Sequence, residues 1–393
     1  MTERPLALGV IGLGMAGAVM VRAAAHHPGV VLTAAAEPHA APREAFGRDF
    51  NARTYPDARA LCEDAAVEAV YIATPHQFHA EHAVAAAECG KHVILEKPMA
   101  LTLADCDRII AAVERAKVHL IVGHTHGFDP AVREMRRIIA SDELGALGMI
   151  ASWNYTNYLY RPRRPEELDT SKGGGILFNQ VPHQIETVRL LGGGLVKSVR
   201  AQVGVLDPAR PTEANCMAFL ELANGVAASL VYSGYDFFDS DELHFWVSER
   251  GSPKQPAHGA SRRALRAHQG PEAALRTSSV GYGAPDQGEP PHQPHFGVTI
   301  ATCARGDLRA SADGVFVYGE DGKREIALLD GGRYSGRLNV LDDLRAAIAT
   351  GRSPLHGGRW GKATLEVALA IQQSARERRE IVLAHQVGIS NCE

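Results

Sequence analysis

A glycine-rich turn directly after an apolar, strand-like run constrains the fold of this chain more than any other feature. The run covers 6–11, and the turn reads G-x-G-x-x-G where a helix-like segment begins. In a parallel α/β fold the first glycine permits the tight turn, the second lets a pyrophosphate approach the backbone, and the third lets the helix pack closely on the strand. The free N–H groups of that helix favour phosphate. We therefore predict a dinucleotide-binding Rossmann domain with a phosphate-facing turn made by Gly12, Leu13, Gly14, Met15, Ala16 and Gly17.

An acidic residue follows the second predicted strand. That strand covers 30–36, and Glu37 comes next, about 20 residues after the turn, where this fold places an acid on the adenosine ribose. A carboxylate accepts hydrogen bonds from the ribose hydroxyls and repels a 2′-phosphate. The sequence therefore predicts NAD as the cofactor. His39 and Arg43 are near enough along the chain to offset this charge, so NADP stays open.

Strand-like and helix-like segments keep alternating to about residue 125. Strands are predicted at 69–74, 92–95 and 119–122, with helices after the first two. Ligands bind at the carboxyl ends of parallel strands, so we expect the residues that follow these strands to face the cofactor. They are Thr74, Pro75, His76 and His79 after the first strand, Glu96 and Lys97 after the second, and His124 after the third.

The remainder of the chain is richer in strands. Strands are predicted at 149–157, 196–205, 214–222, 226–233 and 243–248, and Asn224-Gly225 is typical of a hairpin turn. The predicted fold class is α/β, with an N-terminal Rossmann domain at 1–125 and a C-terminal α+β domain at 126–393. We expect the second domain to be built on an open, largely antiparallel sheet. An exposed face of such a sheet indicates a homodimer or homotetramer.

Residues 251–295 interrupt this pattern. Gly, Pro, His, Arg and Ser dominate the segment, and it has no hydrophobic periodicity. Loops of this length are uncommon in compact domains unless they are functional or disordered. We predict a mobile inserted loop that closes over the site or over a neighbouring subunit.

The charge balance excludes two classes of partner. The 393 residues carry 41 Lys+Arg against 45 Asp+Glu, a formal net charge of −4, so no overall basic field attracts nucleic acid or an anionic membrane. The apolar run at 6–21 is shorter than the roughly 20 residues that a membrane span needs. The six cysteines include no CxxC pair, which is typical of reduced thiols. We expect a cytoplasmic protein whose partner is a small-molecule substrate.

An ordered set of motifs resembles a known family. Thr74-Pro75 with His79, Glu96-Lys97-Pro98, and a triple glycine ahead of His183 follow the dinucleotide turn. Together they resemble the glucose–fructose oxidoreductase / inositol dehydrogenase / rhizopine-catabolism (Gfo/Idh/MocA) family over nearly the whole chain. Segments such as GHTHGFDP (123–130) and YDFFDSDELHFWVSE (235–249) are most similar to its phthalate 4,5-cis-dihydrodiol dehydrogenase branch. The resemblance implies oxidation of an alcohol by hydride transfer to nicotinamide.

Two residues are candidates for handling the hydroxyl proton. Lys97 ends a strand beside Glu96, and a lysine in a closed crevice has a lowered pKa that lets it accept a proton. The alternative is a surface lysine paired with Glu96. The resemblance implies that Lys97 and His183 are catalytic. The family commonly has an aspartate four residues before this histidine, where this chain has Asn179, which accepts no proton. His183 would then use Glu186 as its partner or would serve to position the substrate.

Basic residues gather between an aromatic strand and the glycine run. Arginine binds carboxylates through two parallel hydrogen bonds, so this region is expected to hold an anionic dihydrodiol. A solvated basic loop is the alternative. The predicted substrate-binding residues are His124, His126, Tyr155, Arg161, Arg163, Arg164, Asn179 and His183. No acidic ligand cluster completes the triplet His76, His79 and His82, and we predict no metal site.

Three functions stay open at this stage. The leading hypothesis is NAD-dependent oxidation of a carboxylated cis-dihydrodiol, of the phthalate 4,5-cis-dihydrodiol type, to the corresponding catechol. A sugar or cyclitol dehydrogenase of the same family is the first alternative, and it would bind its polyol through Asp, Asn and His. A non-catalytic dinucleotide-sensing regulator is the second. The presence of Lys97 and His183 argues against a regulator, whereas Asn179 keeps that hypothesis open.

Overall fold

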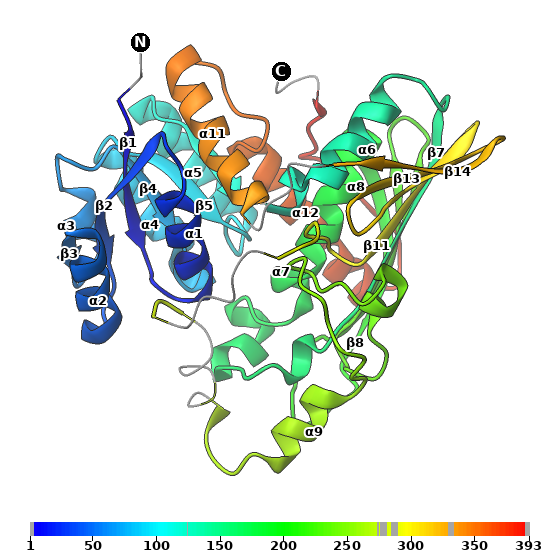
Figure 1. Cartoon of the computed structure of the whole chain (residues 1–393), viewed down its shortest axis with the longest axis horizontal. Coiled ribbons are helices and arrows are strands. Elements are labelled where there is room, and N and C mark those ends of the chain that lie inside the picture. Colours follow the sequence, from blue (N-terminus) through cyan, green and yellow to red (C-terminus); the bar gives the residue numbers. More distant parts are fainter. Residues whose placement is uncertain are drawn as a thin grey trace.

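The computed structural model describes residues 4–123, 125–272, 275, 281–283, 290–328 and 334–389. Two sheets lie beside each other, a smaller one from the N-terminal part (blue to cyan in Figure 1) and a larger one drawn mostly in green to orange. In the described residues, no helix has both the length and the apolar character that crossing a membrane requires.

The first sheet has six parallel strands in the order β3-β2-β1-β4-β5-β6. The strand order reverses between β1 and β4, and doubly wound sheets bind their ligands at such a switch point. Strands β1, β4 and β6 are buried along their whole length, as expected where helices cover both faces. The strands are β1 (Leu6–Ile11), β2 (Val30–Ala36), β3 (Arg53–Tyr55), β4 (Ala69–Ile72), β5 (His92–Glu96) and β6 (Leu120–Gly123). The helices are α1 (Met15–Ala25), α2 (Ala40–Phe50), α3 (Ala58–Cys62), α4 (His79–Glu88) and α5 (Leu103–Ala116).

The second sheet has nine strands in the order β14-β13-β12-β11-β7-β10-β9-β8-β15. Its neighbouring strands are antiparallel except for β7 and β10, so the predicted open, largely antiparallel sheet is confirmed. Asn224-Gly225 makes the predicted turn between β9 and β10, with Gly225 at φ +86°. The strands are β7 (Leu147–Tyr155), β8 (Val196–Gly204), β9 (Asn215–Leu222), β10 (Ala227–Ser233), β11 (Val298–Cys303), β12 (Gly306–Ala310), β13 (Gly314–Gly319), β14 (Gly322–Ala327) and β15 (Ile381–Val382).

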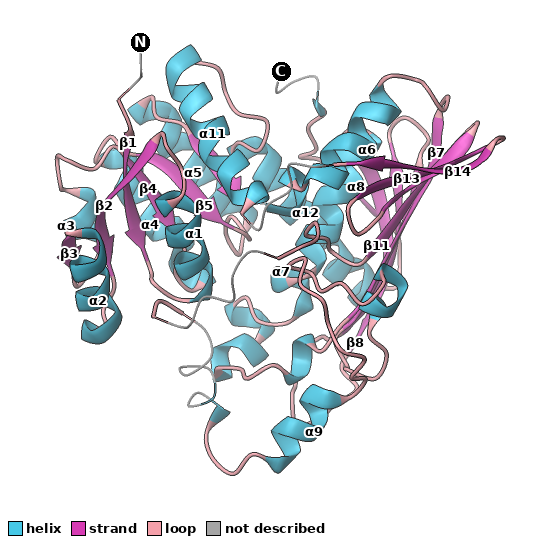
Figure 2. Cartoon of the chain, viewed as in Figure 1, coloured by secondary structure: helices cyan, strands magenta, loops and turns pink. Residues whose placement is uncertain are grey.

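Helices fill the space between the two sheets (Figure 2). Helix α8 (Val181–Gly192) is buried at every position, because it lies against the sheet on one side and against α12 (Gly358–Glu377) on another. The helices α6 (Pro130–Ala140) and α7 (Ile176–Asn179) pack on α8. Helix α11 (Ser335–Thr350) packs instead on α1 and β6, and its Leu341 and Leu344 enter the hydrophobic core of the first sheet. The later part of the chain therefore returns to cover the Rossmann sheet.

Some sequence-based expectations were wrong. The strand predicted at 243–248 is absent, because a 3₁₀ turn at Ser240–His244 is followed by left-handed backbone at Phe245 and Trp246, which have φ values of 58° and 56°. Helix α6 and strands β12 to β14 were not predicted. The segment 251–295 contains helix α9 (Ala260–Ala267), and its Tyr282 bonds to the Leu13 carbonyl and to Asp49. The mobility of this segment stays a prediction.

Candidate active site

One cleft of about 1540 Å³ is lined by residues from both parts of the chain. From the Rossmann sheet come the glycine turn at 12–16, Glu37, the 74–79 segment, and Lys97 at the end of β5. From the second part come the loop at 156–167, Asn179 and Gln180, and the 248–250 segment. The cleft therefore lies at the carboxyl ends of the parallel strands, where the sequence placed a ligand site.

The glycine turn fits a bound pyrophosphate. Gly12 has φ +94°, and a Cβ there would lie 2.8 Å from the Ala73 carbonyl oxygen. A Cβ on Gly17 would lie 1.9 Å from the Gly12 carbonyl oxygen, so only glycine lets α1 approach the turn this closely. Among the described residues, a Cβ on Gly14 would meet nothing within 4 Å, and no side chain caps the N-terminus of α1. The space in front of Gly14 is thus open to phosphate at the positive end of a helix.

Glu37 is fixed beside this turn. Its Oε2 accepts a hydrogen bond from the Leu13 N–H at 3.0 Å, and its Oε1 accepts one from the His39 N–H at 3.1 Å. Arg43 donates to the carbonyl oxygens of Glu37 and Pro38, at 2.7 and 2.9 Å, rather than to the carboxylate, whereas the His39 ring lies against the carboxylate, with Nδ1 2.6 Å from Oε1. The acid therefore keeps its place at the adenosine end of the cleft, which favours NAD over NADP.

Lys97 lies in the cleft wall at the end of β5. Its Nζ donates a hydrogen bond to the Asn179 carbonyl oxygen at 2.6 Å. Burial lowers the pKa of Lys97 to about 8, although the neighbouring Glu96 carboxylate opposes the shift. Glu96 itself accepts a short hydrogen bond from the Tyr71 hydroxyl, so its charge is held close to the ammonium. Lys97 is therefore able to exchange a proton near neutral pH.

The histidines after β4 hold the walls of the cleft together. The ring of His79 lies between two carbonyl oxygens, that of Pro98 at 2.8 Å and that of Thr74 at 2.9 Å. His76 donates from Nδ1 to the Gly173 carbonyl at 2.9 Å, and burial lowers its pKa to about 3, so the ring is neutral. These ring nitrogens face backbone oxygens. Within the described residues, no three His, Cys, Asp or Glu side chains are grouped to hold a metal ion.

Asn179 has a role that an aspartate does not supply. Its Nδ2 donates to the carbonyl oxygens of Gly173 and Gly175, at 3.0 and 2.8 Å, which closes the triple-glycine loop. Its own carbonyl accepts from Lys97. The amide thus supports the loop beside Lys97, where the family commonly has an acid.

His183 lies early in α8, and His126 lies across from it. The two rings meet edge to face at 4.7 Å, and Phe296 packs against both. Asp129 Oδ2 accepts a hydrogen bond from His126 Nδ1 at 2.7 Å. Glu186 turns toward α12, where it accepts hydrogen bonds from Trp360 Nε1 and Thr364 Oγ1. The expectation that His183 leans on Glu186 stays a prediction, and His124 lies outside the described residues.

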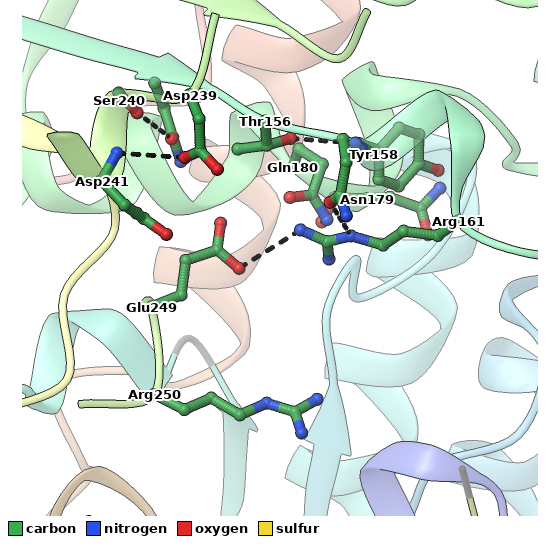
Figure 3. Close-up of polar contacts among 12 residues, drawn as sticks. Thr156, Tyr158, Arg161, Asn179, Gln180, Asp239, Ser240, Asp241, Glu249 and Arg250 are labelled. Atoms are coloured by element: carbon green, nitrogen blue, oxygen red, sulfur yellow. Dashed lines mark hydrogen bonds and ion pairs between the residues drawn. The ribbon is translucent and has the colours of Figure 1, made fainter. Parts of the chain in front are cut away.

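The three arginines predicted to bind the substrate, Arg161, Arg163 and Arg164, lie in different environments. Arg163 stacks on the Tyr158 ring at 3.8 Å, and Arg164 pairs with Glu166 at 3.2 Å. Arg161 donates from Nε to Asn157 Oδ1 at 2.7 Å, and its guanidinium faces Glu249 (Figure 3). Tyr155 does not join this group: it lines a second cavity of about 900 Å³, together with Phe238.

Glu249 and Arg250 line the cleft but were not among the predicted site residues. They follow an apolar run, which is a weak signal that recurs along the chain. Their side chains reach the cleft because the left-handed residues Phe245 and Trp246 turn the backbone just before them. Arg250 NH2 lies 3.6 Å from the Met15 sulfur, so this residue faces the glycine turn.

Comparison with known proteins places the chain among oxidoreductases. The model of an oxidoreductase family with an NAD-binding Rossmann fold matches residues 6–124, and that of the GFO/IDH/MocA C-terminal domain matches 132–249. A 1-carboxy-3-chloro-3,4-dihydroxycyclohexa-1,5-diene dehydrogenase from Comamonas testosteroni is 40% identical over 381 residues, 94% of each chain. An inositol 2-dehydrogenase from Saccharopolyspora erythraea is 32% identical over 62% of this chain and 71% of its own.

A solved structure shares the whole fold. A protein from Bordetella bronchiseptica RB50 assigned as a dehydrogenase superposes with a TM-score of 0.92 and 48% identity, over 96% of this chain and 100% of that one. A levoglucosan dehydrogenase in complex with NADH and levoglucosan has a TM-score of 0.76 over 96% of this chain and 99% of its own. At 21% identity, this second similarity is one of fold.

Proposed function

The chain belongs to the Gfo/Idh/MocA family of NAD-binding oxidoreductases, and from that premise we propose that it oxidises a carboxylated cis-dihydrodiol to the corresponding catechol. The observation that carries this proposal is Lys97, a partly buried lysine at the carboxyl end of β5, which lines the cleft, donates to the backbone carbonyl of Asn179 and has its pKa lowered by burial to about 8. The Comamonas relative, whose name includes both a carboxyl and a dihydroxy group, supports the substrate class.

The chain's own residues handle the proton and the orientation of the substrate. The neutral amine of Lys97 donates one N–H to the Asn179 carbonyl and directs its lone pair at the substrate hydroxyl. When bound, NAD⁺ supplies the acceptor for the hydride that leaves the carbinol carbon. As that C–H bond breaks, the hydroxyl proton moves to Lys97 Nζ and the C–O bond becomes a carbonyl. The hydroxy-enone then moves a ring proton to oxygen and becomes the catechol. We assign His183, with His126 against it, to positioning the substrate.

A substrate panel tests this proposal. NADH formation is followed by absorbance with a carboxylated cis-dihydrodiol, myo-inositol and glucose at equal concentration. We expect the dihydrodiol to give the highest kcat/KM by at least about tenfold. A preference for inositol or glucose would instead identify a cyclitol or sugar dehydrogenase.

Replacement of Lys97 tests its role in the same assay. We expect Lys97→Ala to lower kcat by about 10²- to 10⁴-fold, the usual contribution of a general base. NAD binding, measured by NADH fluorescence, should remain, because the glycine turn and Glu37 are unchanged. A variant with the wild-type rate would remove Lys97 from the mechanism.

We also propose that copies of the chain associate through the outer face of the nine-stranded sheet. Met217 and Phe219 on β9 are 63% and 52% exposed, and Trp153 on β7 is 42% exposed. The register pairs Val231 with both Met217 and Trp153, so these side chains lie on one face. A contiguous apolar patch of this kind is typical of an isologous interface.

A further inference from the structure

Four of the cations that line the cleft have acidic partners within the protein. Arg164 has Glu166 at 3.2 Å and Glu167 at 3.7 Å, and Arg163 has Glu167 at 4.0 Å. Lys172 has Asp169 at 3.5 Å. Lys254 pairs with Asp239 and Asp241. A substrate carboxylate would have to displace one of these acids to reach its cation, so these four side chains offer little net attraction to an anion.

Arg161 is placed differently. Asn157 Oδ1 accepts from its Nε at 2.7 Å, which fixes the guanidinium plane, and the facing carboxylate oxygen, Glu249 Oε2, is 3.5 Å from NH2. This distance exceeds that of a tight charge-assisted hydrogen bond, which is about 2.7–2.9 Å. It equals the distance between Lys172 and Asp169, so distance alone does not set Arg161 apart. The other cations differ in their surroundings: Arg163 donates from Nε and NH2 to the Tyr158 carbonyl oxygen, Lys254 contacts two acids, and Lys172 is exposed to solvent. Figure 3 shows Arg161 and Glu249 facing each other, with Arg250 extending away from the pair. Arg161 thus retains donor capacity for one incoming carboxylate.

Glu249 adds a fixed negative charge at the same place. Its Oε1 is buried, and no described residue bonds to it. Burial alone would raise the pKa of the carboxyl, but neighbouring positive charge, above all that of Arg161, lowers it, so Glu249 is ionised at neutral pH. Its negative charge also opposes the effect of burial on Lys97. A second anionic group in this part of the cleft is therefore repelled by the fixed carboxylate of Glu249.

We propose that Glu249 is a specificity-determining residue that limits the substrate to one carboxylate: Arg161 binds that group, and the Glu249 charge excludes a second. The inference rests on the proposed function and narrows it. It favours a dihydrodiol with a single carboxylate over the phthalate type, whose second carboxylate would meet the Glu249 charge.

The test compares three cis-dihydrodiols that carry zero, one or two ring carboxylates. For the wild-type enzyme we expect kcat/KM to be highest with one carboxylate. In Glu249→Gln, which removes the charge and keeps the shape, the ratio of kcat/KM for two carboxylates over one should rise by about tenfold or more, the effect of one charge a few ångströms away. This ratio cancels any general loss of activity. In Arg161→Gln, the advantage of one carboxylate over none should disappear.

The control variant changes an acid outside the cleft. Glu114→Gln, at an exposed ion pair with Arg359, should leave the ratio unchanged. A wild-type enzyme that prefers two carboxylates, or a Glu249→Gln ratio equal to that of wild type, overturns the inference. If wild type oxidises no dihydrodiol, the proposed function fails instead. In that case calorimetric titration of the NADH complex with benzoate and phthalate still tests whether Glu249 excludes a second carboxylate. Tighter binding of phthalate to wild type than to Glu249→Gln would refute this exclusion.

Discussion

At the end of β5, the Lys97 ammonium lies in the cleft wall and donates to the Asn179 carbonyl at 2.6 Å. Burial disfavours its charged form, whereas Glu96 and Glu249 favour it. Because burial is the larger effect, the pKa falls from its ordinary value of 10.5 to about 8. A lysine on the surface would stay protonated at neutral pH and could not act as a base.

The pH dependence of turnover follows from that pKa. If neutral Lys97 accepts the proton, kcat/KM should rise about tenfold per pH unit below pH 8 and level off above it. Initial rates between pH 6 and 10, with saturating NAD, measure the profile. A rate still rising at pH 10 would indicate a lysine with an unshifted pKa, and a flat profile would exclude Lys97 as the base.

Asn179 offers a second test at the scale of one residue. In Asn179→Asp, a carboxylate oxygen would face the Gly173 and Gly175 carbonyls that now accept from Nδ2 at 3.0 and 2.8 Å. We expect a loss of about 1–3 kcal/mol in the free energy of unfolding at pH 7, measured by urea denaturation.

The direction in which the stability of Asn179→Asp changes with pH is a further check. The Gly173 and Gly175 carbonyl oxygens would face the new carboxylate and favour its protonated form, so the folded-state pKa of Asp at this position rises above its unfolded value of about 3.9. The stability deficit should therefore shrink as the pH falls below that raised folded-state pKa. Asn179→Ala, which loses the bonds without adding a charge, should show no such change. Equal stability of Asn179→Asp and wild type at pH 7 would contradict this account.

At the scale of the element, the turn between β1 and α1 uses its glycines for different purposes. Gly12 and Gly17 bring the chain close to itself, since a Cβ at either position would lie 2.8 or 1.9 Å from a backbone oxygen. A Cβ on Gly14 would come within 4 Å of none of the described residues. The fold therefore requires glycine at positions 12 and 17, whereas a bound ligand is what requires glycine at position 14.

Two alanine variants separate these requirements. Gly17→Ala should lower the midpoint of thermal unfolding, because α1 must move away from the turn. Gly14→Ala should unfold at the wild-type temperature but raise the Kd for NADH by about tenfold or more, equivalent to about 1.4 kcal/mol. Fluorescence titration and differential scanning calorimetry give the two readouts. Unchanged NADH affinity in Gly14→Ala would show that the pyrophosphate lies elsewhere.

At the scale of the whole molecule, the nine-stranded sheet has two unlike faces. One face carries Ala218 and Leu220, which are buried in the same hydrophobic core as residues of α8 and α12. The other carries Met217, Phe219 and Trp153, which are exposed in the single chain. Burying that face in a second copy would remove a large apolar area from water at no cost to the cleft, which opens toward the first sheet.

A charge on the outer face tests this arrangement. Phe219→Glu places like charges opposite each other in a two-fold interface, so we expect a shift toward the monomer in light scattering. The same substitution at Val31, an exposed residue of β2 that is 48% accessible, serves as the control and should leave the mass unchanged. A monomeric wild-type protein would rule out the proposed association.

Local patterns in the sequence determined the Rossmann part. Strands 6–11 and 30–36 were predicted with the observed bounds, and Thr102 caps α5 by accepting from the Asp105 N–H. A strand, a turn and a helix N-terminus are short-range structures whose residue requirements are written within a few positions. The prediction at 243–248 was wrong because apolar alternation does not report a left-handed backbone.

Only the tertiary structure decided how the cleft is charged. The sequence places Arg161, Arg163 and Arg164 together, but their partners differ: a distant residue, Glu249, faces the first, whereas acids of the same loop face the other two. Lys97 likewise meets the Asn179 carbonyl 82 residues away in the chain. Such contacts depend on how the two sheets pack. The burial and charge around a side chain in the cleft come from residues distant in the sequence, so they leave no pattern among its neighbours along the chain.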